Sequence, residues 1–289
     1  MTFRRPLAAA GTRVAALLLT WFAGSPSEAS VLYGVSTYIP GGPVYTVNQE
    51  TGGVSLIGLS GFDNLQDLAS DTRPGSFRLW ACDMATRQLV RIDPVTGAGT
   101  AIGSLNISGG IRTLAFDPVS EQLYGTSASF DRLYRIDPDT GAATLVTMPG
   151  VNVFGEIGAL AFDPSGMLYG SAGLSSSAFL IRISTLNGNN TLVGTTTNVW
   201  PGDIAFRPED GVMFASNGLS GPLPSHLFTV NQQSGNTILV GPYGSGVTFL
   251  NGLAFSPIPD PSAGAVVLMA SSLCHRRRRA GCRAPEIAA

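Results

Sequence analysis

The chain has 289 residues, with 17 basic and 19 acidic side chains and a formal net charge of −2 at pH 7. Only 12% of the residues are charged, whereas 36 are glycine and 19 are proline, which excludes a charged disordered chain and a basic protein that binds nucleic acid. Lysine is absent, so enzymes that use a lysine Schiff base or a phosphate-binding lysine are excluded too.

Residues 1–29 have the pattern of a secretory signal peptide. Three arginines precede an apolar stretch, Val14–Ala23, and small residues follow it up to Ala29. We predict that the export machinery removes this segment by cleavage after Ala29, with Ser27 at the third position before the cut. An uncleaved N-terminal anchor is the alternative, but ten largely apolar residues are fewer than the ~20 that a membrane-spanning helix needs.

The middle of the chain repeats with a period near 45 residues. A Leu-Tyr-Gly marker recurs, and an apolar marker of the Leu-Tyr-Arg-Ile type follows each copy about ten residues later. The five copies of the first marker begin at Leu32, Leu79, Leu123, Leu168 and Met213. A period of this length indicates a repeat architecture in which each repeat is one structural unit.

Each second marker leads into a turn, which is clearest in Asp93–Gly97 and Asp137–Gly141. Aspartate starts such a turn, proline sets the next backbone angle, and glycine adopts the left-handed conformation that closes the hairpin. A third short strand follows, and a Leu-Ala-Phe marker such as Leu160–Phe162 then precedes the next Leu-Tyr-Gly. Four strands per repeat predict an all-β fold, a five-bladed β-propeller, with six blades as the alternative if one strand set is unrecognised.

The order of these markers resembles that of propellers of the NHL and YVTN types, which implies that the Leu-Ala-Phe strand is the innermost of each blade. The array begins at Leu32 and ends at Leu253–Phe255. We therefore predict a domain over residues 31–257, in which the last strand completes the first blade and closes the ring. A solenoid is the rival architecture, but a solenoid needs polar capping repeats, and here the end repeats are as apolar as the others.

This strand order sorts the connections between strands onto two faces. The turns after the innermost and third strands are short and alike, whereas the other connections are longer and differ between blades. Binding residues concentrate in variable loops, so a polysaccharide or protein ligand is expected on the long-loop face. Five aromatic residues serve there either as a binding platform or as local packing anchors: Tyr38, Phe130, Phe154, Trp200 and Tyr243.

Few residues of the repeat body suit catalysis. It contains one histidine, His226, one cysteine, Cys82, and no Gly-x-Ser-x-Gly elbow. We expect His226 to be a solvated loop residue and Cys82 to be a small buried group, and a single cysteine leaves no disulfide inside the body. The sequence therefore predicts a non-enzymatic protein without a cofactor.

A calcium-dependent hydrolase is the alternative function. The residues that precede the innermost strands include several oxygen donors of the kind that Ca²⁺ prefers: Asn64, Gln66, Asp67, Glu156, Asp203 and Asn251. This set resembles the acids and amides around the central ion of propeller lactonases. The resemblance implies a metal site at the channel mouth that is formed by Asn64, Glu156, Asp203 and Asn251. The competing explanation is that polar residues gather at any water-filled channel mouth.

Residues 258–289 have the pattern of a sorting tail. A short proline motif comes first, followed by the apolar segment Ala263–Cys274 and a basic cluster. The motif consists of Pro259, Asp260, Pro261 and Ser262, and the cluster of Arg276, Arg277, Arg278 and Arg279. This order resembles the PEP-CTERM tail of exported bacterial proteins, in which glutamate stands at the position of Asp260. The resemblance implies a membrane helix, processing by an exosortase, and delivery to the cell surface or extracellular matrix of a Gram-negative bacterium.

The apolar segment of this tail is short for a permanent membrane span. Twelve helical residues rise only ~18 Å, against a hydrocarbon core of ~30 Å. We therefore predict a transient membrane anchor whose arginines stay on the cytoplasmic side until processing. A simple tail anchor without processing is the alternative.

Overall fold

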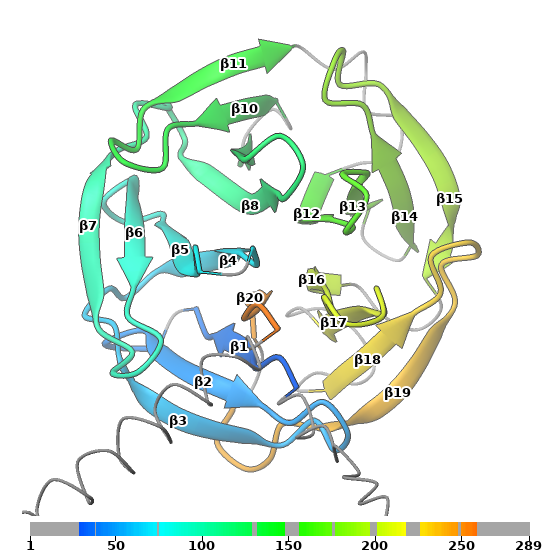
Figure 1. Ribbon diagram of the computed structural model, residues 1–289, viewed down its shortest axis with the longest axis horizontal. Helices are drawn as coiled ribbons and strands as arrows, with labels where there is room; N and C mark the ends of the chain where they lie inside the picture. The colour runs from blue at the N-terminus through cyan, green and yellow to red at the C-terminus, as the bar shows by residue number, and fades with distance from the viewer. Residues whose placement is uncertain are drawn as a thin grey trace, which may run out of the picture.

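The computed structural model describes residues 29–258 except 38, 74, 129–131, 148–155, 175–176, 197–200, 218–225 and 248–249. This part of the chain forms a β-propeller, in which five four-stranded sheets surround a central axis (Figure 1). The predicted five-bladed all-β fold is confirmed, and the six-bladed alternative is wrong. Almost all of the predicted signal peptide and sorting tail lies outside the described residues, and the described part contains no helix suited to crossing a bilayer.

Every blade is an antiparallel meander that runs from the central channel outward to the rim. From the channel to the rim, blade 1 contains β20 (Gly252–Phe255), β1 (Leu32–Val35), β2 (Pro43–Val47) and β3 (Val54–Leu59). Blade 2 contains β4 (Leu65–Asp71), β5 (Arg78–Asp83), β6 (Gln88–Ile92) and β7 (Gly99–Ser104). Blade 3 contains β8 (Ile111–Asp117), β9 (Gln122–Ser127), β10 (Leu133–Ile136) and β11 (Ala143–Thr147).

The remaining two blades follow the same order. Blade 4 contains β12 (Glu156–Phe162), β13 (Leu168–Leu174), β14 (Ser177–Ile183) and β15 (Asn190–Thr196). Blade 5 contains β16 (Pro201–Phe206), β17 (Met213–Asn217), β18 (His226–Val230) and β19 (Thr237–Pro242). The Leu-Ala-Phe marker thus forms the innermost strand of each blade and Leu-Tyr-Gly the second, as predicted.

The two sequence markers pack against each other between blades. The aromatic residue of one Leu-Tyr-Gly strand lies on the phenylalanine of the next blade's Leu-Ala-Phe strand, with ring centroids 5.4 Å apart for Tyr124 and Phe162 and 5.5 Å apart for Trp80 and Phe116. The same contact joins blade 4 to blade 5 and blade 5 to blade 1. Aromatic pairs at such distances stabilise the contact beyond the apolar area that they bury, so the repeated markers are the interface between blades.

The ring closes in the first blade. β20 pairs antiparallel with β1, and the register places Leu32 opposite Phe255. Val31 N–H donates to Ser256 Oγ, and Ser256 N–H donates to the Val31 carbonyl, each at 2.8 Å. The predicted pairing of the last strand with the first blade is therefore confirmed, and the closed ring excludes a solenoid.

Glycines of the outer strands fit against the turns of the next blade. A Cβ atom at Gly103 would lie 2.2 Å from the Thr140 carbonyl oxygen, which leaves no room for a side chain. Three other outer-strand glycines, Gly58, Gly194 and Gly241, meet the corresponding turn of the next blade in the same way. The turns themselves have the predicted form, since Asp93 Oδ1 accepts hydrogen bonds from the N–H groups of Val95 and Thr96.

Replacing Gly103 with alanine is expected to lower the free energy of unfolding by about 1–3 kcal/mol, because the added methyl group must push the Thr140 turn away from the blade. Urea denaturation of the two proteins measures this loss. Gly53→Ala is the matched control, because its Cβ would lie 3.5 Å from the nearest atom, Thr51 Oγ1, at ordinary contact distance. Equal losses in both variants would contradict this inter-blade contact.

Candidate functional site

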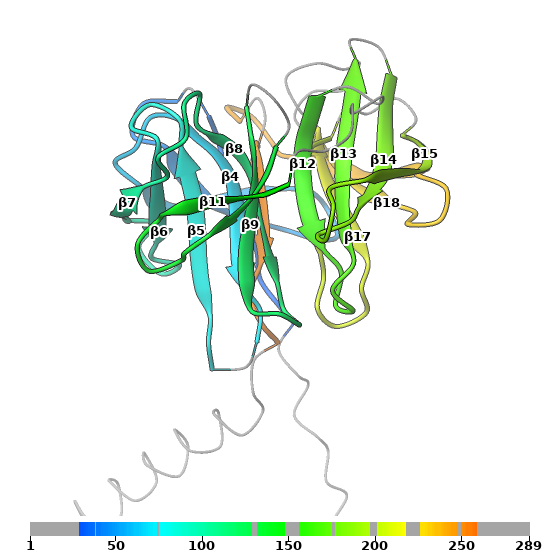
Figure 2. The same cartoon turned by 90° about the horizontal axis from the view of Figure 1, so that it is seen from above.

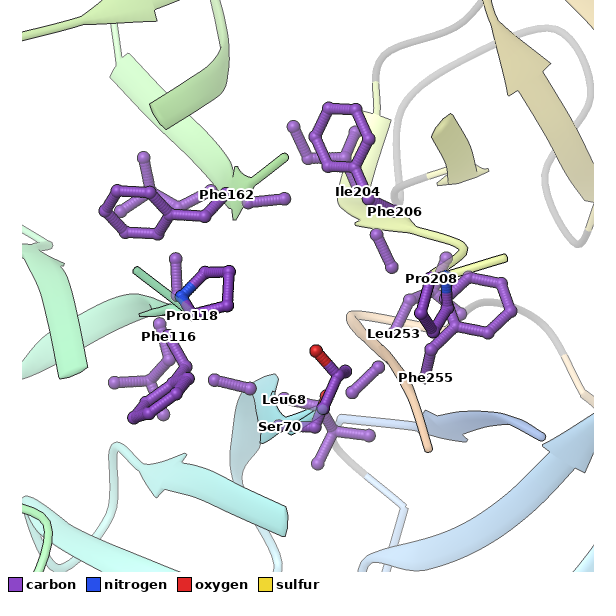
Figure 3. A pocket seen from close by; sticks show the side chains of 18 of the residues that line it. Leu68, Ser70, Phe116, Pro118, Phe162, Ile204, Phe206, Pro208, Leu253 and Phe255 are labelled. Atoms are coloured by element: carbon purple, nitrogen blue, oxygen red, sulfur yellow. The ribbon is translucent and has the colours of Figure 1, made fainter. Parts of the chain in front are cut away.

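The innermost strands enclose an apolar cavity of about 230 Å³ on the propeller axis (Figure 3). Its wall repeats the leucine, alanine and phenylalanine of the marker, followed by proline, so that four phenylalanines line it: Phe116, Phe162, Phe206 and Phe255. Blade 2 departs from the pattern, because Ser70 stands where the other blades have phenylalanine. The cavity therefore offers a mostly apolar surface, with the polar residues Ser70, Thr72 and Arg73 of blade 2 on one side.

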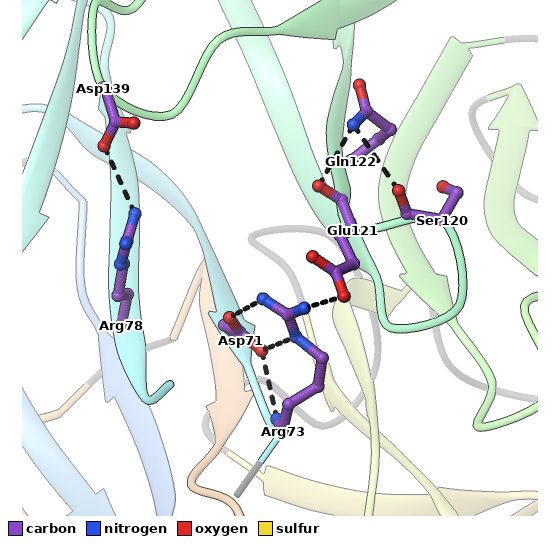
Figure 4. Close-up of polar contacts among 7 residues, drawn as sticks. All are labelled: Asp71, Arg73, Arg78, Ser120, Glu121, Gln122 and Asp139. Atoms are coloured by element: carbon purple, nitrogen blue, oxygen red, sulfur yellow. Dashed lines mark hydrogen bonds and ion pairs between the residues drawn. The ribbon is translucent and has the colours of Figure 1, made fainter. Parts of the chain in front are cut away.

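One side chain outside the repeat, Phe77, takes the place of the missing phenylalanine of blade 2, and a second, Arg73, contacts the phenylalanine of blade 3. Phe77 packs on Tyr33 with ring centroids 5.9 Å apart, and the Arg73 guanidinium lies 5.4 Å from the centroid of Phe116. Arg73 Nη2 is 2.6 Å from Asp71 Oδ2, and the Arg73 guanidinium also pairs with Glu121 of blade 3 (Figure 4). Hydrogen bonds to these two carboxylates raise the pKa of Arg73 above its usual value. Its charge is thus already balanced, and its role is to join blades 2 and 3.

Two fully buried carboxyl groups lie deeper in the channel wall, Asp67 on β4 and Asp203 on β16, with exposed fractions of 1% and 0%. Each occupies the position directly before the Leu-Ala or Ile-Ala pair of its innermost strand. The pairing of β4 with β5 is irregular between Leu65 and Leu68, and that of β16 with β17 between Pro201 and Asp203. A β-bulge of this kind re-aims a side chain, and it occurs here next to both aspartates.

Each of these carboxyl groups links its own blade to the next one. Asp67 accepts hydrogen bonds from Leu68 N–H at 2.6 Å and, in blade 3, from Leu114 N–H at 2.8 Å. Asp203 accepts one from Ile204 N–H at 2.7 Å and a second from Leu253 N–H in blade 1. All four carboxyl oxygens are therefore held by backbone groups of innermost strands.

The two carboxyl groups also lie close enough to each other that each affects the pKa of the other. Two carboxyl groups can share a hydrogen bond only if one of them carries a proton. Burial raises the pKa of both groups, and the neighbouring charge of Asp67 raises that of Asp203 further. Gly252 of blade 1 makes room beside them, because a Cβ atom there would lie 2.7 Å from Leu68 N. With one of them protonated, the two carboxyl groups can share a hydrogen bond across the first blade.

Three of the four predicted calcium ligands have other partners in the structure. Asn64 Oδ1 accepts a hydrogen bond from Gln66 Nε2 at 2.5 Å, and Glu156 pairs with the Arg112 guanidinium. Asp203, which was predicted to lie at the channel mouth, instead joins Asp67 in the buried pair. Among the residues that the structure describes, no group of three or more His, Cys, Asp or Glu side chains is arranged to hold a metal ion. Calorimetric titration with Ca²⁺ tests the predicted set directly.

Asn251, the fourth predicted ligand, precedes β20. Its N–H donates to the Val35 carbonyl at 2.9 Å, and its side-chain oxygen is buried without a hydrogen-bond partner in the described part of the chain. The calcium site stays a prediction.

The remaining candidate residues are structural where the structure describes them. His226 is the first residue of β18 rather than part of the preceding loop, and it is partly buried, with its ring 6.4 Å from that of Phe228. Cys82 is fully buried, as predicted, and its thiol donates to the Arg112 carbonyl at 3.5 Å. Burial raises the pKa of this thiol well above its usual value, which keeps it protonated and unreactive.

Only one of the five aromatic loop candidates lies in the described part of the chain. Tyr243 is 2% exposed and packs in the core between blades 5 and 1, which favours its role as a packing anchor. Tyr38, Phe130, Phe154 and Trp200 lie outside the described residues.

Comparison with known proteins identifies the fold. No protein-family model matches the chain, and no curated protein matches its sequence. A chain in the crystal structure of a nidogen/laminin complex aligns with a TM-score of 0.56 at 13% identity, over 80% of this chain and 100% of that one. A protein of unknown function from Bacteroides thetaiotaomicron VPI-5482 aligns with a TM-score of 0.52 at 16% identity, over 81% of this chain and 66% of that one. At these identities the likeness shows a shared β-propeller fold.

Proposed function

We propose that this chain is a non-enzymatic, exported β-propeller that binds a polysaccharide or protein ligand at the cell surface or in the extracellular matrix. The observation that carries the proposal is the position of the two ends of the propeller. β1 begins and β20 ends at the same face, because Leu32 pairs with Phe255 (Figure 2). The Asp-Pro turns are at this face, and the long connections are at the opposite one.

This arrangement suits a protein held by a tail that follows β20. An anchor at that face would leave the long connections pointing away from the membrane, where a ligand can reach them. The resemblance of Pro259–Ser262 and the arginine cluster to a PEP-CTERM tail supports such an anchor, with an exosortase as the processing enzyme. The predicted export machinery acts at the other end, after Ala29.

The chemistry of the channel supports a scaffold rather than an enzyme. Asp67 and Asp203 are buried, and their oxygens accept backbone hydrogen bonds. Carboxyl groups engaged in this way stabilise blade contacts, whereas a general acid or base must reach a substrate.

The absence of lysine makes this proposal directly testable. Ala85→Lys places a single side-chain amine in the β5–β6 connection of the long-loop face, and Val95→Lys places one in an Asp-Pro turn, at a position that is 82% exposed. A membrane-impermeant, amine-reactive biotin reagent on intact cells is expected to label Ala85→Lys several-fold more than Val95→Lys. The unsubstituted chain gives the background from the terminal amine.

The outcomes separate location from orientation. Labelling of neither variant before cell lysis would contradict surface delivery, and equal labelling would contradict a fixed orientation. The intact mass of the surface-extracted protein is expected to end near Pro259–Ser262. A mass that retains Arg276–Arg279 would favour the simple tail anchor.

A further inference from the structure

The residue that follows the predicted cleavage point is held tightly in the fold. Ser30 is 2% exposed, whereas Ala29 before it is exposed. Both hydrogen-bond donors of Ser30 point at one carboxylate: its N–H donates to Glu209 Oε1, and its hydroxyl donates to Glu209 Oε2 at 2.8 Å. Gln49 Nε2 donates to the Ser30 carbonyl at 2.6 Å. The main chain at Ser30 is therefore fixed on both sides of its Cα.

This contact spans the seam of the ring, which is the boundary between blade 5 and blade 1. Ser30 leads into β1 of blade 1, and Glu209 lies in the connection between β16 and β17 of blade 5. The adjacent hydrogen bonds between Val31 and Ser256 hold β20 at the same seam. The Ser30–Glu209 contact thus connects the start of blade 1 to blade 5.

The negative charge of Glu209 would bind an α-ammonium group more strongly than it binds the neutral N–H of a peptide. A peptide group offers one neutral donor, whereas an α-ammonium group offers three donors and a positive charge, and charge-assisted hydrogen bonds are the stronger kind. Arg207, a cation of the same connection, is already engaged with Asp210 through contacts of 2.9 and 2.6 Å. Glu209 and Asp210 are the anionic groups at this position, and Arg207 is the cationic one.

We propose that Glu209 is the binding site for the α-ammonium group that signal cleavage creates on Ser30. This inference rests on the proposed function, because it needs export and hydrolysis of the Ala29–Ser30 bond. Hydrolysis consumes one water, leaves a carboxylate on Ala29, and leaves an amine on Ser30 that takes up a proton at neutral pH. The hydrogen bond to Glu209 then becomes an ion pair across the seam between blades 5 and 1.

The burial of Ser30 also sets the order of events. A peptidase needs an extended, accessible chain, and the backbone of Ser30 is inaccessible once it is docked. Cleavage therefore precedes ring closure, and the newly formed terminus docks as the seam forms.

Because the chain has no lysine, the N-terminal amine can be labelled selectively. In the cleaved protein the α-amine is the sole primary amine, so an amine-reactive reagent such as trinitrobenzenesulfonate reports on this group alone. The full chain is expressed with its own leader, the exported product is purified, and its N-terminus is identified by mass. The labelling rate is then measured against pH in native and denaturing buffer for the wild type, Glu209→Gln and Glu50→Gln.

The native wild-type amine is expected to react at least about tenfold more slowly than the denatured one, because Ser30 is 2% exposed in the fold, although Glu209 itself is exposed. Its titration midpoint is expected about one pH unit above that of Glu209→Gln, since an adjacent carboxylate favours the charged form over the usual value of about 8. Glu50→Gln removes an exposed carboxylate from the neighbouring β2–β3 turn and is expected to match the wild type. Glu209→Asp keeps the charge and provides a second measurement if Glu209→Gln does not fold.

The outcomes distinguish this inference from the proposed function. Protein cleaved at Ser30 with the same titration midpoint in wild type and Glu209→Gln would overturn the Glu209 site and leave export intact. Cleavage at another bond would also overturn it, because the amine would then not be on Ser30. Protein that stays uncleaved inside the cell would contradict the proposed function itself.

Discussion

A chain that lacks residues 250–257 is expected to lose the cooperative thermal transition of the propeller. The deletion removes β20 and three side chains that are at most 1% exposed, Leu250, Leu253 and Phe255. Emptying one such buried position costs about 2–5 kcal/mol, and the sum over three positions reaches the whole stability of a typical domain, about 5–15 kcal/mol. β1 would also lose its inner partner and present an unpaired edge to the channel. Circular dichroism during heating measures the effect.

Deleting residues 259–289 is the control, because these residues follow the last strand. This deletion is expected to leave the melting temperature within a few degrees of that of the full chain. If the 250–257 deletion melted at the temperature of the full chain, β20 would not be what closes the ring.

The free energy of unfolding is expected to fall as pH rises from about 5 to 8. Folded Asp67 and Asp203 have raised pKa values, because burial disfavours their charged forms, so the folded pair keeps a proton that the unfolded chain releases above pH ~4. Each retained proton lowers the stability by about 1.4 kcal/mol per pH unit, or about 4 kcal/mol over this range. Asp93 and Asp137 have lowered pKa values, so their ionised forms stabilise the folded state. This stabilisation is lost only as pH falls below ~4, outside the range from about 5 to 8.

The Asp67→Asn variant separates the pair from other titrating groups. An amide donates to Asp203 without binding a proton, so the slope between pH 5 and 8 is expected to flatten. One backbone N–H, of Leu68 or Leu114, loses its acceptor, which costs about 1–3 kcal/mol at pH 5. Urea denaturation at several pH values measures both effects, with Glu50→Gln as the control. An unchanged slope in Asp67→Asn would show that the pair does not share a proton.

The fold could be predicted from the sequence because its repeated residues form the repeated contacts. The aromatic residue of Leu-Tyr-Gly and the phenylalanine of Leu-Ala-Phe touch each other between blades, so both residue types recur with the period of the blades. The offset between the first and last markers likewise predicted the β20–β1 pairing. Where Ser70 breaks the pattern, the replacement contact with Tyr33 comes from Phe77, which belongs to no repeat and was therefore not predicted.

The buried carboxyl pair could not be predicted in the same way. Asp67 and Asp203 come from blades separated by the width of another blade, and their meeting depends on the diameter of the closed ring. The bulge beside each aspartate also interrupts the alternation from which side-chain directions are predicted. The available signal was an aspartate directly before the Leu-Ala or Ile-Ala pair in two of five repeats, which indicated a shared position but not its burial.

The pairing of β20 with β1 also determines the order in which the protein folds. Blades 2 to 5 each consist of contiguous strands, so their hairpins form from local contacts as soon as the chain is available. Blade 1 must wait for the last strand, and the loop that this pairing closes contains nearly the whole body, which carries the largest entropic cost. We therefore expect blades 2 to 5 to form before blade 1 is complete. Until β20 pairs with it, β1 presents an unpaired edge, and such an edge can pair wrongly with a second chain.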